Sequence, residues 1–153
     1  MNLKTTISED IIINRDIDWL FGFSQNINER RKWDKQTLEI NFLDDFTELQ
    51  KGARVYTKSI EGIRMDTEYL TFESPNEISI KMLNESPVFK SFVGSWNYSK
   101  IENSRTKLKI SYQFNLRFPY NLIPKKVSRK IKVNIAKKLC LLDSYVNEKN
   151  DQQ

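Results

Sequence analysis

One segment limits the possible folds of this chain more than any other: residues 124–148 can form a single long amphipathic helix. Pro124 suits the first helical position, where its missing N–H removes no hydrogen bond, and no Gly or Pro follows before Glu148. Six apolar residues fall on one side of this helix: Val127, Ile131, Ile135, Leu139, Leu142 and Val146. Six basic residues fall on the opposite side: Lys125, Lys126, Arg129, Lys130, Lys132 and Lys137. The roughly 90 preceding residues read as strands, so a sheet wrapped around the helix is the natural cover for its apolar face.

Length and composition predict one domain. With 153 residues, 39% hydrophobic and 12% aromatic, the chain can bury a core. We expect residues 1–153 to form a single ligand-binding domain, with a core over residues 5–148 and a short disordered tail over 149–153. The N-terminal residues lack the apolar stretch of a signal peptide. With one cysteine, Cys140, no internal disulfide can form, and we expect a cytoplasmic protein.

The charge distribution leaves two interpretations open. The net charge is +5, and residues 125–138 hold seven basic residues and no acidic one. Such a face can be the solvated outside of a packed helix, or it can meet an anionic membrane or nucleic acid. No aromatic residues interleave with the basic ones, which argues against nucleic acid. Peripheral contact with an anionic membrane therefore stays open.

The middle of the chain alternates between short turns and strands. Residues 5–14 predict a first strand, and residues 15–35 predict two short helices that break near Asn26, with Asp16 as the first N-cap. Six strands follow, over residues 37–43, 54–60, 65–73, 77–83, 90–101 and 105–116. Leu38, Ile40 and Phe42 are predicted to share the inner face of the first of these six. The short turns predict an antiparallel sheet of about seven strands, with one apolar face.

The segment from Pro87 to Tyr98, PVFKSFVGSWNY, resembles a motif of the START-like superfamily. Bacterial cyclase/dehydrase and coenzyme-Q-binding members often show Gly-Pro-Phe followed by Gly-x-Trp-x-Phe, and Gly94, Trp96 and Tyr98 match the second part. Ser86 replaces the first Gly, and Val88 is an extra residue. Trp33 also resembles the Trp that closes the second helix in this superfamily. The resemblance implies an α+β helix-grip fold, in which a curved antiparallel sheet wraps around the long C-terminal helix and two short helices follow strand 1.

In a helix-grip protein the ligand cavity lies between the sheet and the long helix. The positions expected to face this cavity are mostly apolar, as in a lipid or quinone site, and an ordinary core would look the same. The predicted lining consists of Ile40, Ile80, Phe92, Trp96, Tyr98, Leu108, Ile110, Tyr112, Phe114, Ile131, Asn134, Ile135, Lys138 and Leu142. Tyr56, Tyr69, Tyr98 and Tyr112 can supply phenolic hydroxyls there, and Tyr98 and Tyr112 have the more favourable strand parity.

Two polar residues interrupt the apolar face of the long helix. Asn134 and Lys138 are four residues apart, so they lie one helical turn from each other. A buried lysine needs an anionic partner or water. We therefore predict that Lys138 and Asn134 bind the polar or acidic head group of a ligand; the alternative is that both side chains reach solvent.

Three functions remain compatible with the sequence. The first is binding or transport of a hydrophobic or amphipathic small molecule, such as a lipid, quinone or polyketide. The second is a cyclase/dehydratase-type enzyme that uses the same cavity, and the third is an interaction protein that uses the basic helix face. The sequence has no histidine and one cysteine, so it offers no catalytic motif and no metal site. We expect no cofactor, no nucleic-acid partner, no transmembrane segment and a monomer or dimer.

Overall fold

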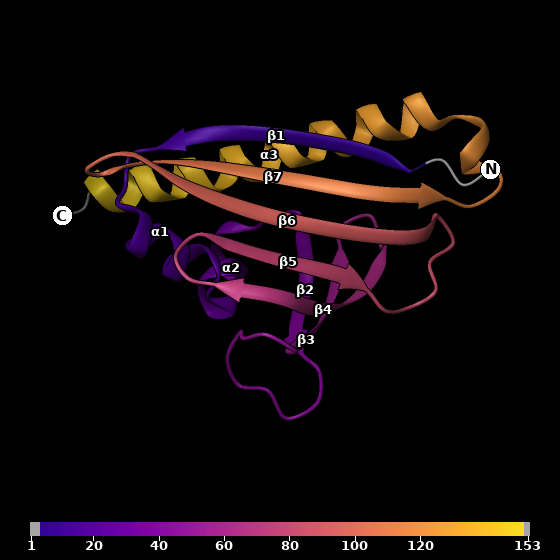
Figure 1. The fold of residues 1–153 in the computed structure, drawn as a ribbon, viewed down its shortest axis with the longest axis horizontal. Coiled ribbons are helices and arrows are strands. Elements are labelled where there is room, and N and C mark those ends of the chain that lie inside the picture. Colours follow the sequence, from indigo (N-terminus) through magenta and orange to yellow (C-terminus); the bar gives the residue numbers. More distant parts are fainter. Residues whose placement is uncertain (1–3, 152–153) are drawn as a thin grey trace.

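The computed structural model describes residues 4–151, which form one curved sheet and three α-helices (Figure 1). The elements in chain order are β1 (Thr5–Ile13), α1 (Ile17–Ser24), α2 (Ile27–Trp33), β2 (Thr37–Phe42), β3 (Arg54–Ser59), β4 (Arg64–Glu73), β5 (Glu77–Met82), β6 (Phe89–Glu102), β7 (Arg105–Leu116), the 3₁₀ helix η1 (Tyr120–Leu122) and α3 (Pro124–Asp151). The sheet order is β1-β7-β6-β5-β4-β3-β2, and every neighbouring pair is antiparallel. The predicted α+β class, with about seven strands and two short helices after strand 1, is confirmed.

The first short helix begins at its predicted cap, Asp16, and the second begins at the predicted break, where Asn26 is the N-cap. The Asp16 carboxylate accepts a hydrogen bond from the Trp19 N–H at 3.1 Å, and the Asn26 side chain accepts one from the Glu29 N–H at 3.1 Å. Each bond satisfies an N–H that the first turn of a helix otherwise leaves free. Trp33 ends α2 and is buried in the main core, as its position predicted.

Burial along α3 is uneven. Its buried residues are Ile135, Lys138, Leu139, Leu142 and Val146, all in the second part of the helix. Before Ile135, Val127 and Ile131 are half-buried and most other side chains are exposed. Figure 1 shows α3 running beside β1, with α1 and α2 near its C-terminal part. The helix continues three residues beyond the predicted Glu148, to Asp151, and residues 152–153 of the predicted tail lie outside the described residues.

Two irregularities in the strands change which side chains face inward. The β2–β3 register shifts between Thr37 and Glu39, and Leu38 is 61% exposed, so the prediction that Leu38 faces the core is wrong. A bulge displaces a strict two-residue alternation and turns the extra side chain outward. A second shift, between Tyr69 and Thr71, leaves Tyr69 buried and in edge contact with Phe72.

Two apolar clusters fill the interior. The larger one joins α1, α2 and the second part of α3 to the sheet, and includes Trp33, Trp96 and Leu139. The smaller one consists of Phe89, Phe92, Phe114 and Leu116, and Val127 and Ile131 of α3 pack against it.

Replacing Leu139 by Ala tests whether the second part of α3 anchors the fold. Leu139 is 2% exposed, so truncation leaves a cavity in the larger cluster and should lower the free energy of unfolding by about 2–5 kcal/mol. Val133→Ala on the exposed side of the same helix should change it by less than about 0.5 kcal/mol. Urea unfolding of both variants measures the difference, and equal effects would contradict this account.

Candidate functional site

A cavity of about 340 Å³ lies between the sheet and the middle of α3. Its apolar wall comes from four strands and α3 and includes Val55, Met65, Ile80, Phe92 and Ile131. Its polar wall includes Arg30, Thr57, Tyr69, Tyr112 and Asn134. The volume lies within the range of small-molecule sites, and the mixture of apolar walls with a few polar groups is typical of them.

The opening of the cavity is marked by the exposed lining residues Ile60, Glu61 and Lys137. The turn between β3 and β4 faces α3 here, and Lys130 Nζ lies 3.2 Å from Glu61 Oε2. Both side chains are exposed, so this ion pair contributes little to stability. It does connect the two elements that border the opening.

A buried ion cluster ties α3 to the end of α2 at one side of the cavity. Asp34 Oδ2 accepts hydrogen bonds from Lys138 Nζ at 2.8 Å, from Arg30 Nε at 3.0 Å and from Thr37 Oγ1 at 2.8 Å. The Asp34 side chain has no exposed surface, and the Lys138 side chain is 11% exposed. With all three groups ionised, two cations surround one anion, and the cluster holds one net positive charge.

The cluster shifts the pKa values of its members. Burial acts to raise the pKa of the Asp34 carboxyl, but the charges of Lys138 and Arg30 and the hydrogen bonds from Lys138 and Thr37 outweigh it, so this pKa lies well below its usual range. Burial lowers the pKa of Lys138; Asp34 offsets part of this effect, and the Arg30 charge adds to it. Asp34 therefore stays ionised and offsets one of the two positive charges, so the cluster keeps one net positive charge.

Several hydrogen-bond donors of the cavity wall have no protein partner. Within residues 4–151, the Nη atoms of Arg30 and the hydroxyls of Tyr69 and Tyr112 make no hydrogen bond to protein groups. Burial raises the pKa of Tyr112 to about 12, and it also raises the pKa of Tyr69. Both phenols therefore remain protonated at neutral pH and can donate hydrogen bonds into the cavity.

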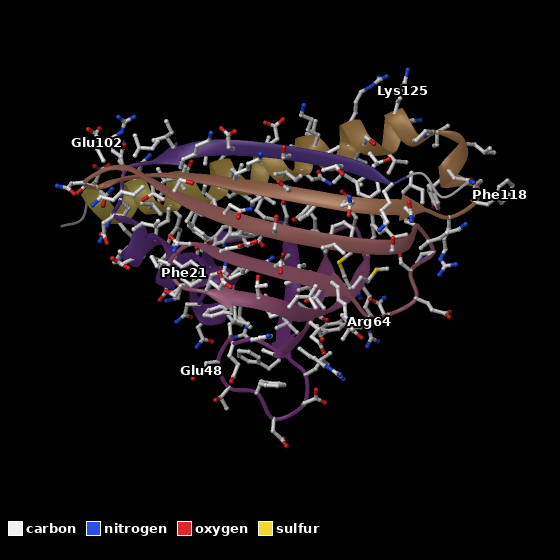
Figure 2. The ribbon with its side chains drawn as sticks, in the orientation of Figure 1. Phe21, Glu48, Arg64, Glu102, Phe118 and Lys125 are labelled. Carbon is white, nitrogen blue, oxygen red and sulfur yellow. The ribbon has the colours of Figure 1, made fainter. Side chains whose placement is uncertain are left out.

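A second and more open groove, of about 610 Å³, lies between α1, α2 and the loop that joins β2 to β3. Phe21, Phe42 and Phe46 contribute to its walls, and its charged lining residues, Arg31 and Glu48, are both exposed. Figure 2 labels Phe21 and Glu48 on this lower part of the molecule. No buried charge adjoins this groove among the described residues, so the cavity beneath α3 is the better candidate site.

Solved structures with the same architecture are numerous, although the sequence comparisons found nothing. No protein-family model matches the chain, and no curated protein matches it either. The Zhui aromatase/cyclase from Streptomyces sp. R1128 superposes with a TM-score of 0.77 at 12% identity, over 95% of this chain and 94% of the other. A START superfamily protein from Mycobacterium smegmatis gives 0.74 at 11% identity, over 92% and 98%. The di-domain aromatase/cyclase BexL of the BE-7585A biosynthetic pathway gives 0.76 at 13% identity, over 94% of this chain but only 46% of the other.

The fold is the helix grip. Identities this low establish the fold and nothing finer, and at that level the START-like resemblance drawn from Gly94, Trp96 and Tyr98 is confirmed. None of the helices in residues 4–151 combines the length and the hydrophobicity that crossing a membrane requires.

The helix-grip cavity brings together some of the predicted site residues and leaves others in the core. Six of the fourteen line the cavity: Ile80, Phe92, Tyr112, Ile131, Asn134 and Lys138. The other eight are buried in the two apolar clusters and do not line it: Ile40, Trp96, Tyr98, Leu108, Ile110, Phe114, Ile135 and Leu142. The Tyr98 hydroxyl lies 2.6 Å from Ser24 Oγ and 2.8 Å from Gln25 Nε2, so it connects β6 to α1.

Sequence reasoning did not single out two charged residues of the site, Arg30 and Asp34, and it ranked Tyr69 below Tyr98 and Tyr112. The isolated lysine on the apolar face of the long helix was a signal that an anion lies nearby, and Asp34 is that anion. Tyr69 was assigned the less favourable strand parity because the register shift after it is not visible in the pattern.

The pH dependence of stability tests the ion cluster. Because the folded-state pKa of Asp34 lies below its unfolded value of about 3.9, the unfolded chain binds more protons in acid, and the stabilisation present at neutral pH is lost as the pH falls below about 5. Asp34→Asn should be less stable than the wild type at neutral pH and should lose less stability on acidification. Urea unfolding across this pH range measures both slopes. Asp18→Asn, an exposed carboxylate in the first turn of α1, is the control and should keep the wild-type slope.

Proposed function

We propose that this protein binds an amphipathic small molecule in the cavity between the sheet and α3. The observation that carries the proposal is the unpartnered donor set of Arg30, Tyr69 and Tyr112 in a largely apolar cavity. These donors line the cavity and have no protein partner within residues 4–151, so a ligand oxygen that enters the cavity can accept from them. The ligand we infer has an apolar body, which packs against Ile80, Phe92 and Ile131, and a carbonyl, phenolate or carboxylate oxygen.

The ion cluster supports an acidic or strongly polarised ligand. Arg30 uses Nε for Asp34, and its two Nη atoms remain for a ligand in a planar arrangement that suits a carboxylate. Lys138 donates a hydrogen bond to Asp34. In this proposal Lys138 therefore does not contact the ligand but positions Arg30 through the shared carboxylate. Asn134, one turn away on α3 and part of the cavity wall, remains a candidate contact to the head group.

The alternative on the same cavity is a cyclase/dehydratase-type enzyme. The same donors can polarise a carbonyl and stabilise an enolate when they converge on one oxygen. Two of the solved structures that superpose on this chain are described as aromatase/cyclases, one of them a di-domain protein of which this chain spans about half. Conversion of a bound substrate into a different product would favour this alternative over binding alone.

Native mass spectrometry of protein purified from its own cells tests the proposal first. We expect a stoichiometric apolar ligand, such as a lipid, quinone or polyketide, that organic extraction releases. The variant Ile131→Trp, which fills the cavity from α3, should be purified without it. Val133→Trp on the exposed side of α3 is the matched control and should retain it. A protein that stays empty after challenge with a hydrophobic library would contradict the proposal.

Removal of single hydroxyls tests the donor set. With 8-anilinonaphthalene-1-sulfonate as the fluorescent amphipathic probe, Tyr112→Phe and Tyr69→Phe should each weaken binding roughly two- to tenfold, because each loses one hydrogen bond to the probe. Tyr98→Phe removes a hydroxyl that bonds to Ser24 and Gln25 outside the cavity, so it should lower stability and leave the probe affinity unchanged. An affinity loss for Tyr98→Phe equal to that for Tyr112→Phe would contradict the assignment.

A further inference from the structure

One end of the molecule projects without cover from the other described residues, 4–151. Residues 118–126, from the end of β7 through η1 into the first turn of α3, are nine consecutive exposed residues. Figure 2 shows Phe118 and Lys125 at this end, both pointing away from the ribbon.

Apolar side chains are concentrated in this projecting segment. Phe118 is 74% exposed, Leu122 67% and Ile123 46%. Single exposed hydrophobic residues are common, but several together on one loop usually mark an interaction surface. They fall within six consecutive residues directly before α3, so they can enter another apolar phase together.

Positive charge surrounds the same segment. Residues 117–130 contain five basic residues and no acidic residue. Among residues 4–151, Lys125, Lys126 and Arg129 form no ion pair, and the first turn of α3 holds no acidic residue. The positive end of the helix dipole points at these cations and is unfavourable for them. An external anionic surface relieves both effects.

We propose that the loop Phe118–Ile123 and the first two turns of α3 form a docking surface for an anionic lipid bilayer. Lys125, Lys126 and Arg129 attract the lipid phosphates, and Phe118, Leu122 and Ile123 enter the interfacial region below them. A nucleic acid satisfies the cations but gives the aliphatic side chains no apolar phase to enter. A second copy of this chain carries the same positive charge at this end and is repelled.

The docking surface lies next to the candidate cavity. Val127, within the first two turns of α3, and Ile131, at their end, pack against the smaller apolar cluster, and Phe89, Phe92 and Ile131 line the cavity. Docking thus places this end of the cavity nearest the bilayer. The inference does not depend on the cavity binding a ligand.

Vesicle co-sedimentation of the full chain tests the docking surface. The wild type should bind vesicles of mixed phosphatidylcholine and phosphatidylglycerol, bind pure phosphatidylcholine much more weakly, and lose affinity as salt is added. Lys125→Glu/Lys126→Glu should reduce partition into the anionic vesicles by at least about 25-fold, since each basic residue near such a surface contributes about fivefold. Lys35→Glu/Lys51→Glu changes the net charge equally at exposed lysines elsewhere and should have a much smaller effect.

The apolar contribution has its own variants. Phe118→Ser/Leu122→Ser should weaken vesicle binding at least about tenfold, whereas Leu38→Ser, at a residue of similar exposure on β2, should not. Phe118→Trp reports insertion directly, through a blue shift of its emission and quenching by brominated lipid tails. Unfolding curves confirm that these exposed substitutions leave the fold intact.

Three outcomes would overturn the proposal. If Phe118→Ser/Leu122→Ser left vesicle binding unchanged, the contact would be purely electrostatic, without insertion. Tight, salt-sensitive binding of a DNA duplex with no vesicle binding would assign the surface to nucleic acid. Concentration-dependent dimerisation that Phe118→Ser/Leu122→Ser abolishes would make it an interface between two copies.

Discussion

The apolar face of α3 has to be buried, and the sheet covers only part of it. From Ile135 onward the helix is held by the larger core cluster, through Leu139, Leu142 and Val146. Of the apolar residues of α3 before Ile135, only Val127 and Ile131 are half-buried, and they pack against the smaller cluster, at the start of β6 and the end of β7. The cavity lies where the two apolar clusters meet, because residues of both clusters line it. Uneven burial of one helix therefore both fixes the fold and leaves room beneath the helix.

The Lys138–Asp34–Arg30 cluster stabilises this boundary. A charged group buried alone is costly, but here each charge has a partner at hydrogen-bond distance. The cluster joins α3 to Arg30 of α2 and to Asp34 just after it, and apolar contacts hold α3 on both sides of Lys138. Because Asp34 accepts from both cations at one oxygen, a change in either cation alters the position of the other. The Asp34 carboxylate thus both belongs to the candidate site and links α3 to α2.

Much of the fold was predictable because its signals are local. The helix face over residues 124–148, the caps Asp16 and Asn26 and the alternation in β7 all depend on neighbours in sequence. Leu38 and Tyr69 were misplaced because a register shift depends on the partner strand, and no pattern within one strand records it. The candidate site was harder for a related reason: a core position and a cavity position carry the same apolar residues. Asp34 follows α2 and Lys138 lies in α3, so their pairing depends on the tertiary structure. The only sign of it in the sequence is the single lysine on the apolar face of the long helix.

The polar groups around the cavity determine what kind of chemistry the wall can support. Tyr112, with its pKa raised to about 12, stays protonated at neutral pH, and Tyr69 is shifted in the same direction. Asp34 accepts three side-chain hydrogen bonds and is held by two cations, which leaves it a weak base. The Arg30 guanidinium donates hydrogen bonds and cannot accept a proton. Tyr69, Tyr112 and Arg30 therefore present hydrogen-bond donors, and these act on oxygen atoms that are negative or become so. A set of this kind binds an acidic or carbonyl-bearing ligand directly, and it lowers the energy of an enolate only if the reacting chain supplies its own proton acceptor or water provides one.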